Sequence, residues 1–549
     1  MRSSDGGDAS TTTPAPTLPD EHTVERWLLS ARERGNRASE LSRGRGWTSG
    51  NGVVPLIDGA TYFARLSEEL GGLRRGDRVF IADWRGDEDE IIVEGVTLGE
   101  LLTGLVRRGV EVRGLLWRSH PRIMGFQEET QVELARAVNE AGGELLLDER
   151  VRRGGSHHQK FVMIERDGRP EVAFVGGIDL CHGRRDRRTH EGDPQRERLD
   201  AIYGQRPGWH DVQVEIRGPA LGDLATTFRE RWNDRTPVEQ RSSVLDRVRV
   251  RLAREPTRPE PFPAPARAGA NAGSCAVQVL RTYPEKRPPF PFAPRGERTI
   301  ARLYRKALER ARRLVYVEDQ YLWSEEVASV FAAALARAPE LRLISVVPRF
   351  PERNSVVSGP VYRQGQERLL RELARAGGDR VAVYDLQNDG DHPIYVHAKS
   401  VIVDDVLAVV GSDNLNRRSW THDSELSVAV LDDELDNREP RDPGGLGDGA
   451  RRFARQLRLD LWREHLGLAE GDDAELLDPV RGFRLWRSRA SALDVWYRSD
   501  RTEARPPGQV RHHSIPQSGR WRRMWAEPLH RLLVDPDGRP RAMRRARRI

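Results

Sequence analysis

Two His-x-Lys triplets are the residues of this sequence best suited to chemistry. His158 and Lys160 belong to the first triplet, His397 and Lys399 to the second, and each triplet leads into a short, mostly apolar run. In a β-strand, residues i and i+2 point to the same face. Each histidine would therefore project beside its lysine at the point where a strand begins.

Chance does not account for this recurrence. The chain has 14 His and only four lysines, so about 0.1 His-x-Lys pairs are expected at random. The other cations among the 90 Lys+Arg are arginines, which indicates that lysine is required at these two places. An acid follows each lysine by five residues, Glu165 in the first case and Asp404 in the second, and we count both acids among the catalytic residues.

A second apolar run and a turn of small residues follow each triplet. Asp179 lies in the first turn, and Ser412 and Asn414 lie in the second. Small residues let the backbone approach a ligand closely, and these three side chains offer polar groups beside it. Together with two ammonium groups, they suit the anionic oxygens of a phosphodiester, so we count all three as phosphate-binding residues.

The histidines suggest a reaction in two steps. One would attack phosphorus and form a covalent phospho-histidine, while the other protonates the leaving alkoxide and later deprotonates the incoming water or alcohol. A carboxylate on each histidine would fix its tautomer; the candidates are Asp186 in the first half and Asp423 and Glu425 in the second. No metal or other cofactor is expected, because the lysines supply the positive charge.

The elements that position these residues occur twice. Six β-like runs precede residue 254 and six follow residue 273, and helical patterns separate the first three runs of each set. This order predicts a parallel or mixed sheet covered on both faces. The first set is Arg78–Trp84, Glu111–Trp117, Glu144–Glu149, Lys160–Glu165, Val172–Gly176 and Val212–Ile216. The second is Leu314–Asp319, Arg342–Val347, Val381–Leu386, Ser400–Asp404, Leu407–Gly411 and Leu426–Leu431. The helical patterns are Leu98–Arg108, Gln131–Ala141, Glu326–Arg337 and Gln366–Ala376.

Composition shifts suggest five segments along the chain. A polar leader occupies residues 1–22, and residues 254–273 form a Pro/Ala-rich linker. The linker separates a first half at 23–253 from a second half at 274–470. Residues 471–549 form an Arg/Trp-rich C-terminal extension.

Composition also excludes several protein classes. With 37% hydrophobic residues, the chain can build a real core, so wholesale disorder is excluded. Two cysteines, Cys181 and Cys275, are too few for a disulfide framework or a Cys-based zinc site. The leader lacks the apolar segment of a signal peptide, and the longest apolar run is about half of a membrane span. We expect a cytoplasmic protein that could act peripherally at the inner face of the membrane.

Charge is concentrated at the C-terminal end. Residues 480–549 carry 18 Arg and 6 Asp+Glu, a net charge of +12 within a chain of net charge +6. A basic extension suggests an anionic partner, either lipid head groups or nucleic acid, although a solvated arginine-rich tail has the same composition. Its tryptophans, such as Trp486 and Trp496, could seat at a lipid interface or pack the extension onto the body.

The motifs resemble those of the phospholipase D superfamily, whose members carry two HKD motifs. The likeness rests on HHQKFVMIE with FVGGIDLCHGRRD, and on IYVHAKSVIVDD with VVGSDNLNRRSWTHDSEL. The segments Pro55–Gly59, Trp209–Asp211 and Val317–Tyr321 are similar to the phosphatidylcholine-hydrolysing branch, here without a C2 domain or a PX–PH pair. The resemblance implies two similar α/β/α sandwich halves, related by a pseudo-two-fold axis, that share one active site.

The resemblance also implies roles for individual residues. His158 would be the nucleophile and His397 the general acid, with Lys160 and Lys399 on the phosphate. Glu425 stands where the family's histidine-orienting acid falls after the second motif, and Asp186 is the best match after the first. Glu165 departs from the family pattern, which has Asp at that position.

The resulting hypothesis is a phospholipase D-type phosphodiesterase. It would release phosphatidic acid and a head-group alcohol from glycerophospholipids, and it would exchange head groups when another alcohol intercepts the intermediate. The alternatives are a cardiolipin synthase-like phosphatidyltransferase, a nuclease that uses the same site, and a catalytically inactive scaffold. Phospholipid is the expected partner, nucleic acid is the less favoured one, and no partner protein is implied.

Overall fold

The computed structural model describes residues 21–93, 95–118, 128–195, 199–238, 260–262, 269–352, 358–514 and 526–546. Most of the predicted leader and linker lies outside these residues. All twelve predicted strands are present, with ends that differ by a residue or two, which confirms an α/β fold. No described helix is both long enough and apolar enough to cross a membrane.

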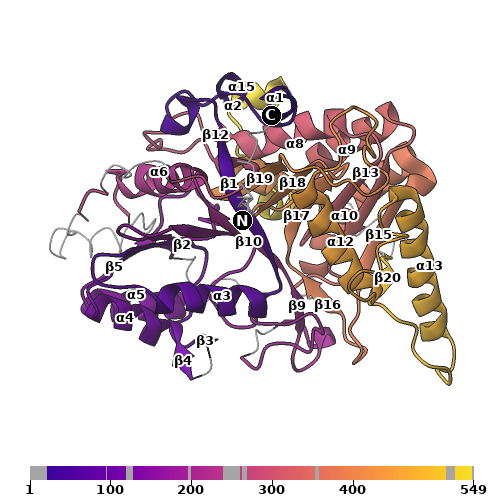
Figure 1. Cartoon of the computed structure of the whole chain (residues 1–549), viewed down its shortest axis with the longest axis horizontal. Coiled ribbons are helices and arrows are strands. Elements are labelled where there is room, and N and C mark those ends of the chain that lie inside the picture. Colours follow the sequence, from indigo (N-terminus) through magenta and orange to yellow (C-terminus); the bar gives the residue numbers. More distant parts are fainter. Residues whose placement is uncertain are drawn as a thin grey trace, which may run out of the picture.

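The first half is a mixed sheet between two helical layers (Figure 1). The strands in sheet order are β1 (Thr48–Ile57), β10 (Val212–Arg217), β8 (Val172–Gly176), β7 (Phe161–Glu165), β2 (Arg78–Asp83), β5 (Glu111–Trp117) and β6 (Glu144–Asp148). Three strands, β2, β5 and β6, run parallel to one another and are connected through helices, and the other neighbours pair antiparallel. The helices are α3 (Gly59–Gly71), α4 (Leu98–Arg107), α5 (Glu128–Glu140) and α6 (Ala220–Trp232).

The second half repeats this order. Its sheet strands are β11 (Cys275–Tyr283), β19 (Glu425–Asp432), β18 (Leu407–Gly411), β17 (Lys399–Val403), β13 (Leu314–Asp319), β14 (Arg342–Val346) and β15 (Val381–Leu386). Its main helices are α8 (Thr299–Arg310), α9 (Glu325–Arg337), α10 (Ser358–Gly377), α11 (Arg417–Thr421) and α12 (Arg452–Leu466).

One 16-stranded sheet joins the two halves, because β1 pairs with β11. The strand order therefore reads the same outward from this seam in both directions, as the predicted pseudo-two-fold relation requires. A second junction is the parallel pair of β9 (Gly208–His210) with β16 (Ile394–Val396). Sequence reasoning did not anticipate any of these four strands.

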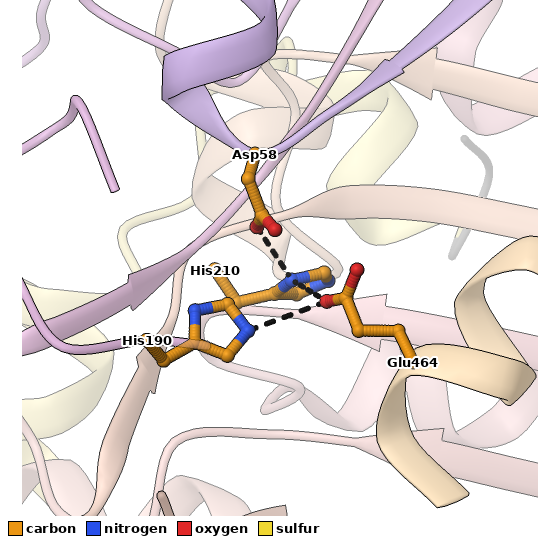
Figure 2. A group of neighbouring side chains, drawn as sticks. All are labelled: Asp58, His190, His210 and Glu464. Atoms are coloured by element: carbon orange, nitrogen blue, oxygen red, sulfur yellow. Dashed lines mark hydrogen bonds and ion pairs between the residues drawn. The ribbon is translucent and has the colours of Figure 1, made fainter. Parts of the chain in front are cut away.

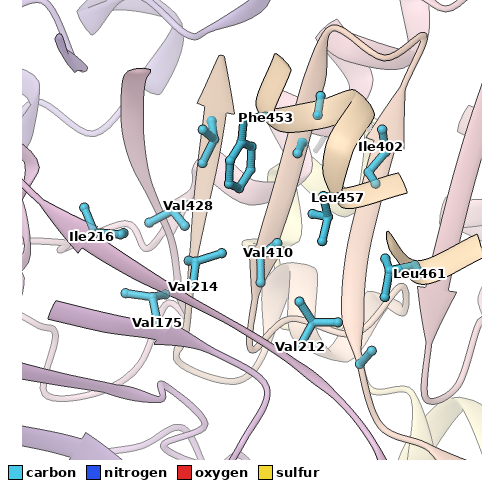
Figure 3. Close-up of a cluster of buried hydrophobic side chains, with 14 of the residues drawn as sticks. Val175, Val212, Val214, Ile216, Ile402, Val410, Val428, Phe453, Leu457 and Leu461 are labelled. Atoms are coloured by element: carbon cyan, nitrogen blue, oxygen red, sulfur yellow. The ribbon is translucent and has the colours of Figure 1, made fainter. Parts of the chain in front are cut away.

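A hydrophobic core continues across the seam (Figure 3). Val212, Val214 and Ile216 of β10 belong to the same buried cluster as Val410 of β18 and Val428 of β19. Helix α12 covers this cluster from the second half, with Phe453, Leu457 and Leu461 facing it. Because residues from both halves exclude water from one core, the halves pack as one body.

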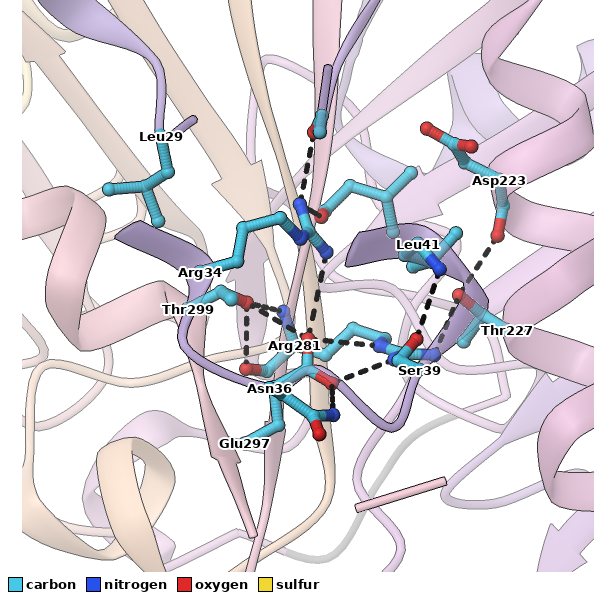
Figure 4. A network of polar contacts seen from close by, with 12 residues as sticks. Leu29, Arg34, Asn36, Ser39, Leu41, Asp223, Thr227, Arg281, Glu297 and Thr299 are labelled. Carbon is cyan, nitrogen blue, oxygen red and sulfur yellow. Dashed lines mark hydrogen bonds and ion pairs between the residues drawn. The ribbon is translucent and has the colours of Figure 1, made fainter. Parts of the chain in front are cut away.

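A buried polar network holds the N-terminal segment on the seam (Figure 4). Arg281 on β11 donates to Glu297 at 2.7 Å, to Ser39 at 2.7 Å and to Glu230 of α6 at 2.8 Å. Burial opposes ionisation, but Arg281 lowers the pKa of Glu297, so the pair stays charged. A buried charge that is fully paired in this way fixes the register of the elements that supply its partners.

The C-terminal extension packs against the second half. Helix α13 (Pro479–Arg498) runs along its edge, and strand β20 (Val510–His512) extends the sheet beside β15. Trp486 is fully buried, with its ring centroid 5.7 Å from that of Trp462 and 5.1 Å from that of Tyr384. Trp486 therefore packs the extension onto the body, while Trp521 and Trp525 lie outside the described residues. Short helices η4 (His530–Val534) and α15 (Arg541–Arg545) follow.

Candidate functional site

His158 stands at the entrance of β7, held by the chain that precedes β19. Its backbone N–H donates to Ser424 O at 2.8 Å, and Ser424 N–H donates to Ser156 O at 3.0 Å. Its imidazole Nδ1 lies 2.9 Å from Glu425 Oε2. The carboxylate comes from the second half and the histidine from the first, so this pair spans the seam.

His397 repeats the arrangement with the halves exchanged. Its backbone N–H donates to His210 O at 2.8 Å, which continues the β9–β16 pairing. Its Nδ1 lies 2.7 Å from Asp211 Oδ2, and Asp211 belongs to the first half. Gly177 makes room for this carboxylate, because a Cβ there would lie 2.1 Å from Asp211 Oδ1. Both histidines thus hold a buried carboxylate at Nδ1 and keep Nε2 for other work.

The lysines lie close to both histidines. Lys160 Nζ is 3.2 Å from Asp179 Oδ1, and Lys399 Nζ donates to Gln320 Oε1 at 3.3 Å. Burial lowers the pKa of His158 well below its usual range, and Lys160 and Lys399 lower it further. His397 is affected in the same way by burial and by Lys399. Both imidazoles are therefore neutral when no anion is bound.

Lys399 is itself perturbed. Burial lowers its pKa to about 7; the charge of Asp211 opposes this shift, and the charge of Lys160 adds to it. Two ammonium groups that repel each other in a buried space form a site for an anion, because a bound anion relieves both the repulsion and the lost hydration. This is the electrostatic setting that a phosphodiester needs.

Asp186 lies outside the catalytic pairs. Its carboxylate accepts hydrogen bonds from Trp209 N at 2.7 Å, Arg187 N at 2.8 Å and Gly192 N at 3.1 Å, so it shapes the loop that leads to β9. Asp211 takes the position predicted for Asp186. The signal was present in the sequence, since Asp211 immediately precedes β10 just as Glu425 begins β19, and β10 and β19 are equivalent strands.

Asp179 also differs from the prediction. Burial opposes ionisation, but Lys160 and then Arg184 lower the pKa of Asp179 to about 2. An ionised carboxylate accepts hydrogen bonds only, so it cannot bind the anionic oxygens of a phosphodiester. Asp179 instead holds Lys160 in place.

The two predicted phosphate ligands of the second half lie in different surroundings. Ser412 Oγ donates to Glu425 Oε2 at 2.6 Å, so it orients the carboxylate that orients His158. Asn414 is buried, and its Oδ1 has no hydrogen-bond partner within the described part of the chain. An amide oxygen only accepts hydrogen bonds, so Asn414 could donate to an anionic oxygen only through its Nδ2 group.

Glu165 and Asp404 lie at the far ends of β7 and β17. Five strand residues span roughly 16 Å, which separates these acids from the lysines at the strand entrances. Glu165 pairs with Arg78, and Asp404 accepts the backbone N–H groups of Arg312, Arg313 and Leu314 at 2.7–2.8 Å. Both acids therefore anchor neighbouring strands, and their predicted place among the catalytic residues is not supported by this geometry.

A second group of buried histidines and carboxylates adjoins the site (Figure 2). His210 Nδ1 lies 3.1 Å from Asp58 Oδ1 and 3.2 Å from Glu464 Oε1, and its Nε2 lies 3.1 Å from Glu318 Oε2. His190 Nε2 lies 3.3 Å from Glu464 Oε1. Burial opposes protonation, but Glu318 raises the pKa of His210 well above its usual range, so His210 is charged.

These residues have the composition of a transition-metal site, with two imidazoles and two carboxylates whose donor atoms lie within 4.8 Å of one another. The hydrogen bonds that they make to one another satisfy the carboxylates without an ion. The network connects His210 to three carboxylates: Asp58 after β1, Glu318 on β13 and Glu464 on α12. His210 immediately precedes Asp211. It therefore braces the segment that carries the carboxylate partner of His397.

Comparison with known proteins gives a consistent assignment. Residues 81–328 and 367–503 match a family model described as Phospholipase D. Phospholipase D A of Dictyostelium discoideum is 26% identical over 76% of this chain and 36% of its own length. Phospholipase D alpha 2 of Oryza sativa subsp. japonica is 25% identical over 75% of this chain and 63% of its own length. Phospholipase D2 of Bos taurus is 24% identical over 80% of this chain and 55% of its own length. The chain thus spans between about a third and two thirds of each relative.

Among solved structures, the phosphatidylserine synthase of Haemophilus influenzae Rd KW20 aligns with a TM-score of 0.48 at 15% identity. The alignment covers 70% of this chain and 82% of that one.

Proposed function

Because the chain belongs to the phospholipase D family, we propose that it hydrolyses the head-group phosphodiester of glycerophospholipids to phosphatidic acid and an alcohol. The observation that carries the proposal is the pair of histidines, each with a buried carboxylate at Nδ1 and both close to two lysines. Such a site supplies a nucleophile, a proton donor and positive charge around one anion.

In the first step, His158 attacks phosphorus through Nε2. Its Nδ1–H donates to Glu425, which fixes the tautomer that leaves the Nε2 lone pair free. The phosphorus–oxygen bond to the head group breaks, and His397 Nε2 gives its proton to the departing alkoxide. Lys160, Lys399 and the Nδ2 group of Asn414 donate to the non-bridging oxygens as negative charge shifts onto the leaving oxygen.

The charge of the substrate prepares His397 for this role. In the free site, burial and then Lys399 keep the pKa of His397 low. A phosphodiester between the lysines offsets their charge, so His397 binds a proton as the substrate binds. Asp211 stabilises the imidazolium that forms.

In the second step, His397 removes a proton from water, which attacks the phospho-histidine and releases phosphatidic acid from His158. An alcohol in place of water gives head-group exchange. The protein would meet its substrate from the cytoplasm, as a peripheral protein at the inner face of the membrane, with its basic C-terminal extension in contact with the head groups.

The test uses phosphatidylcholine liposomes with and without ethanol, and mass spectrometry of the lipids. We expect phosphatidic acid, accompanied by phosphatidylethanol when ethanol is present, and neither product from His158→Asn. If neither product forms from phosphatidylcholine, phosphatidylethanolamine or phosphatidylglycerol, the proposal is wrong. Cleavage of DNA by the same protein would then assign the site to a nuclease.

A further inference from the structure

Two adjacent leucines are the most exposed large apolar side chains of the described residues. Leu532 is 71% exposed and Leu533 is 61% exposed, and both belong to the short helix η4. The segment is fixed on both sides: His530 is buried with Nδ1 at 2.9 Å from Val361 O, and Asp535 is buried with Oδ1 accepting from Arg418 N at 2.9 Å. The leucines are therefore held outward by an anchored backbone.

This segment lies against the loops that build the site. Arg418, on α11, connects them: its Nη1 is 3.4 Å from Leu533 O, and its Nη2 donates to Gly154 O at 2.8 Å. Its Nε donates to Asp423 at 2.6 Å, and Asp423 accepts from Ser156 N at 2.8 Å. One arginine side chain thus separates the exposed leucines from the loop that leads into His158.

Positive charge flanks the leucines. Arg153 on the same loop is exposed, as are Arg541, Arg544 and Arg545 on α15, and none of the four forms an ion pair with a described carboxylate. Arg152 donates to two backbone oxygens, Gly538 O at 3.1 Å and Glu285 O at 2.7 Å. Burial and then the nearby charge of Arg544 lower the pKa of Arg152. Cations that repel one another at a surface favour an anionic partner.

We propose that Leu532, Leu533 and the arginines of this rim form the surface through which the protein docks on an anionic phospholipid membrane. This inference rests on the proposed function and names the surface by which the same site reaches its substrate. Burial of leucine side chains in the acyl region lowers the free energy of membrane binding, and so does the attraction of arginines to the lipid phosphates. Nucleic acid would use the arginines alone and leave the leucines in water, so the exposed pair favours a membrane.

The test measures binding apart from chemistry. His158→Asn protein is sedimented with phosphatidylcholine vesicles that either contain or lack phosphatidylglycerol. We expect the change L532A/L533A to lower the partition coefficient of the protein between water and vesicles at least about tenfold for both kinds of vesicle, because less apolar surface is buried. The change R541Q/R544Q/R545Q should cost about fivefold per contacting arginine on the anionic vesicles only.

Matched controls are available elsewhere on the surface. Leu435 and Leu446 are exposed at 52% and 36%, and L435A/L446A removes as many leucines from the segment between β19 and α12. R481Q/R484Q/R487Q removes three arginines from α13. Both controls should bind vesicles like the His158→Asn parent. If a control loses as much binding as its counterpart, or if L532A/L533A binds within about twofold of the parent, the docking surface is wrong.

Two further readouts separate this inference from the proposed function. In otherwise unsubstituted protein, L532A/L533A should hydrolyse a soluble short-chain phosphatidylcholine at the parent rate and liposomes at a reduced rate. Leucine-dependent vesicle binding without hydrolysis of any lipid would support the docking surface and refute the proposed chemistry. Binding of DNA that needs the arginines, together with vesicle binding that ignores the leucines, would overturn the inference.

Discussion

The substitution Asp211→Asn tests the crossed pairing of histidines and carboxylates. Asp211 Oδ2 is 2.7 Å from His397 Nδ1, and both groups are buried. The asparagine keeps the size of the side chain, but its amide removes the charge and can donate to Nδ1, which favours the wrong tautomer. The neutral imidazole of His397 would then carry its proton on Nε2, so it could not accept a proton from water. The imidazolium that donates to the leaving group would lack a charged acceptor at Nδ1.

The size of the effect follows from the bond that is lost. A hydrogen bond to a charged group contributes about 1.5–3 kcal/mol, or about 10- to 150-fold in rate. Loss of the correct tautomer adds to this, and the comparable change in a serine protease triad costs about 10⁴-fold. We therefore expect kcat/KM of Asp211→Asn to fall by about 10²- to 10⁴-fold on phosphatidylcholine.

Substrates with two different leaving groups distinguish the roles of the two histidines. A p-nitrophenyl phosphodiester releases an anion that needs no proton, whereas choline departs as an alkoxide. Asp211→Asn should impair the choline ester far more than the p-nitrophenyl ester, because it acts on the proton donor. Glu425→Gln acts on the nucleophile and should impair both substrates alike.

Asp186→Asn serves as the matched control. Its carboxylate accepts backbone hydrogen bonds and lies 3.7 Å from His190 Nδ1, all within the first half, and the amide oxygen retains part of that capacity. It should change the rate less than tenfold on either substrate. Equal losses for Asp186→Asn and Asp211→Asn, or a loss for Asp211→Asn that ignores the leaving group, would refute the assignment of Asp211 to His397.

Four further outcomes are expected. Given a p-nitrophenyl alkyl phosphodiester, whose leaving group needs no proton, His397→Asn should accumulate the alkylphosphoryl group on His158, seen as a mass increase of the intact protein, and no increase above that of His158→Asn would contradict the assigned nucleophile. Lys399 is charged below its pKa of about 7 and neutral above it, so the protein should bind dibutyl phosphate more weakly as pH rises through 7. The Lys399→Met protein should bind dibutyl phosphate weakly at every pH. Calorimetry measures both affinities, and a wild-type affinity that does not change with pH would contradict this prediction. His210→Ala should lose about 3–5 kcal/mol in urea unfolding, because it removes the charged imidazole that pairs with the buried Asp58, Glu318 and Glu464. Glu318 keeps His465 Nε2 at 2.7 Å and the Tyr316 hydroxyl at 2.6 Å. The raised pKa of His210 means that its contribution is complete below about pH 6.5 and declines as pH rises toward the folded pKa. EDTA should leave lipid hydrolysis and the unfolding midpoint unchanged, and loss of either with recovery on adding zinc would make the histidine cluster a metal site.

The sequence allowed most strands and the positions of both triplets to be predicted, because alternating and apolar runs act locally. The two strands that form the seam, β1 and β11, were not predicted, for physical reasons. β1 contains Gly50, Gly52 and Pro55, which interrupt a strand pattern, and β11 contains Gln278 and Arg281, which find their partners only in the folded protein.

The catalytic carboxylates were harder to assign. Spacing along the chain relates a residue to its own strand, and it favoured Asp186 for the first half. The true partners of His158 and His397 come from across the seam, and only the parallel contacts of Ser424 and His210 reveal the exchange. Glu165 and Asp404 were predicted to be catalytic because each follows its lysine by five residues. That constant spacing reflects the equal length of β7 and β17, and it does not bring the acids into contact with the site.

The exchange of carboxylates across the seam has a consequence for assembly. A single half would hold a histidine and a lysine but would lack the acid that orients that histidine, so it could be complete only as a pair of copies. Joining the two copies in one chain replaces a concentration-dependent encounter by an intramolecular one. It also frees the copies to diverge, one histidine toward attack and the other toward proton transfer, which an identical pair could not do.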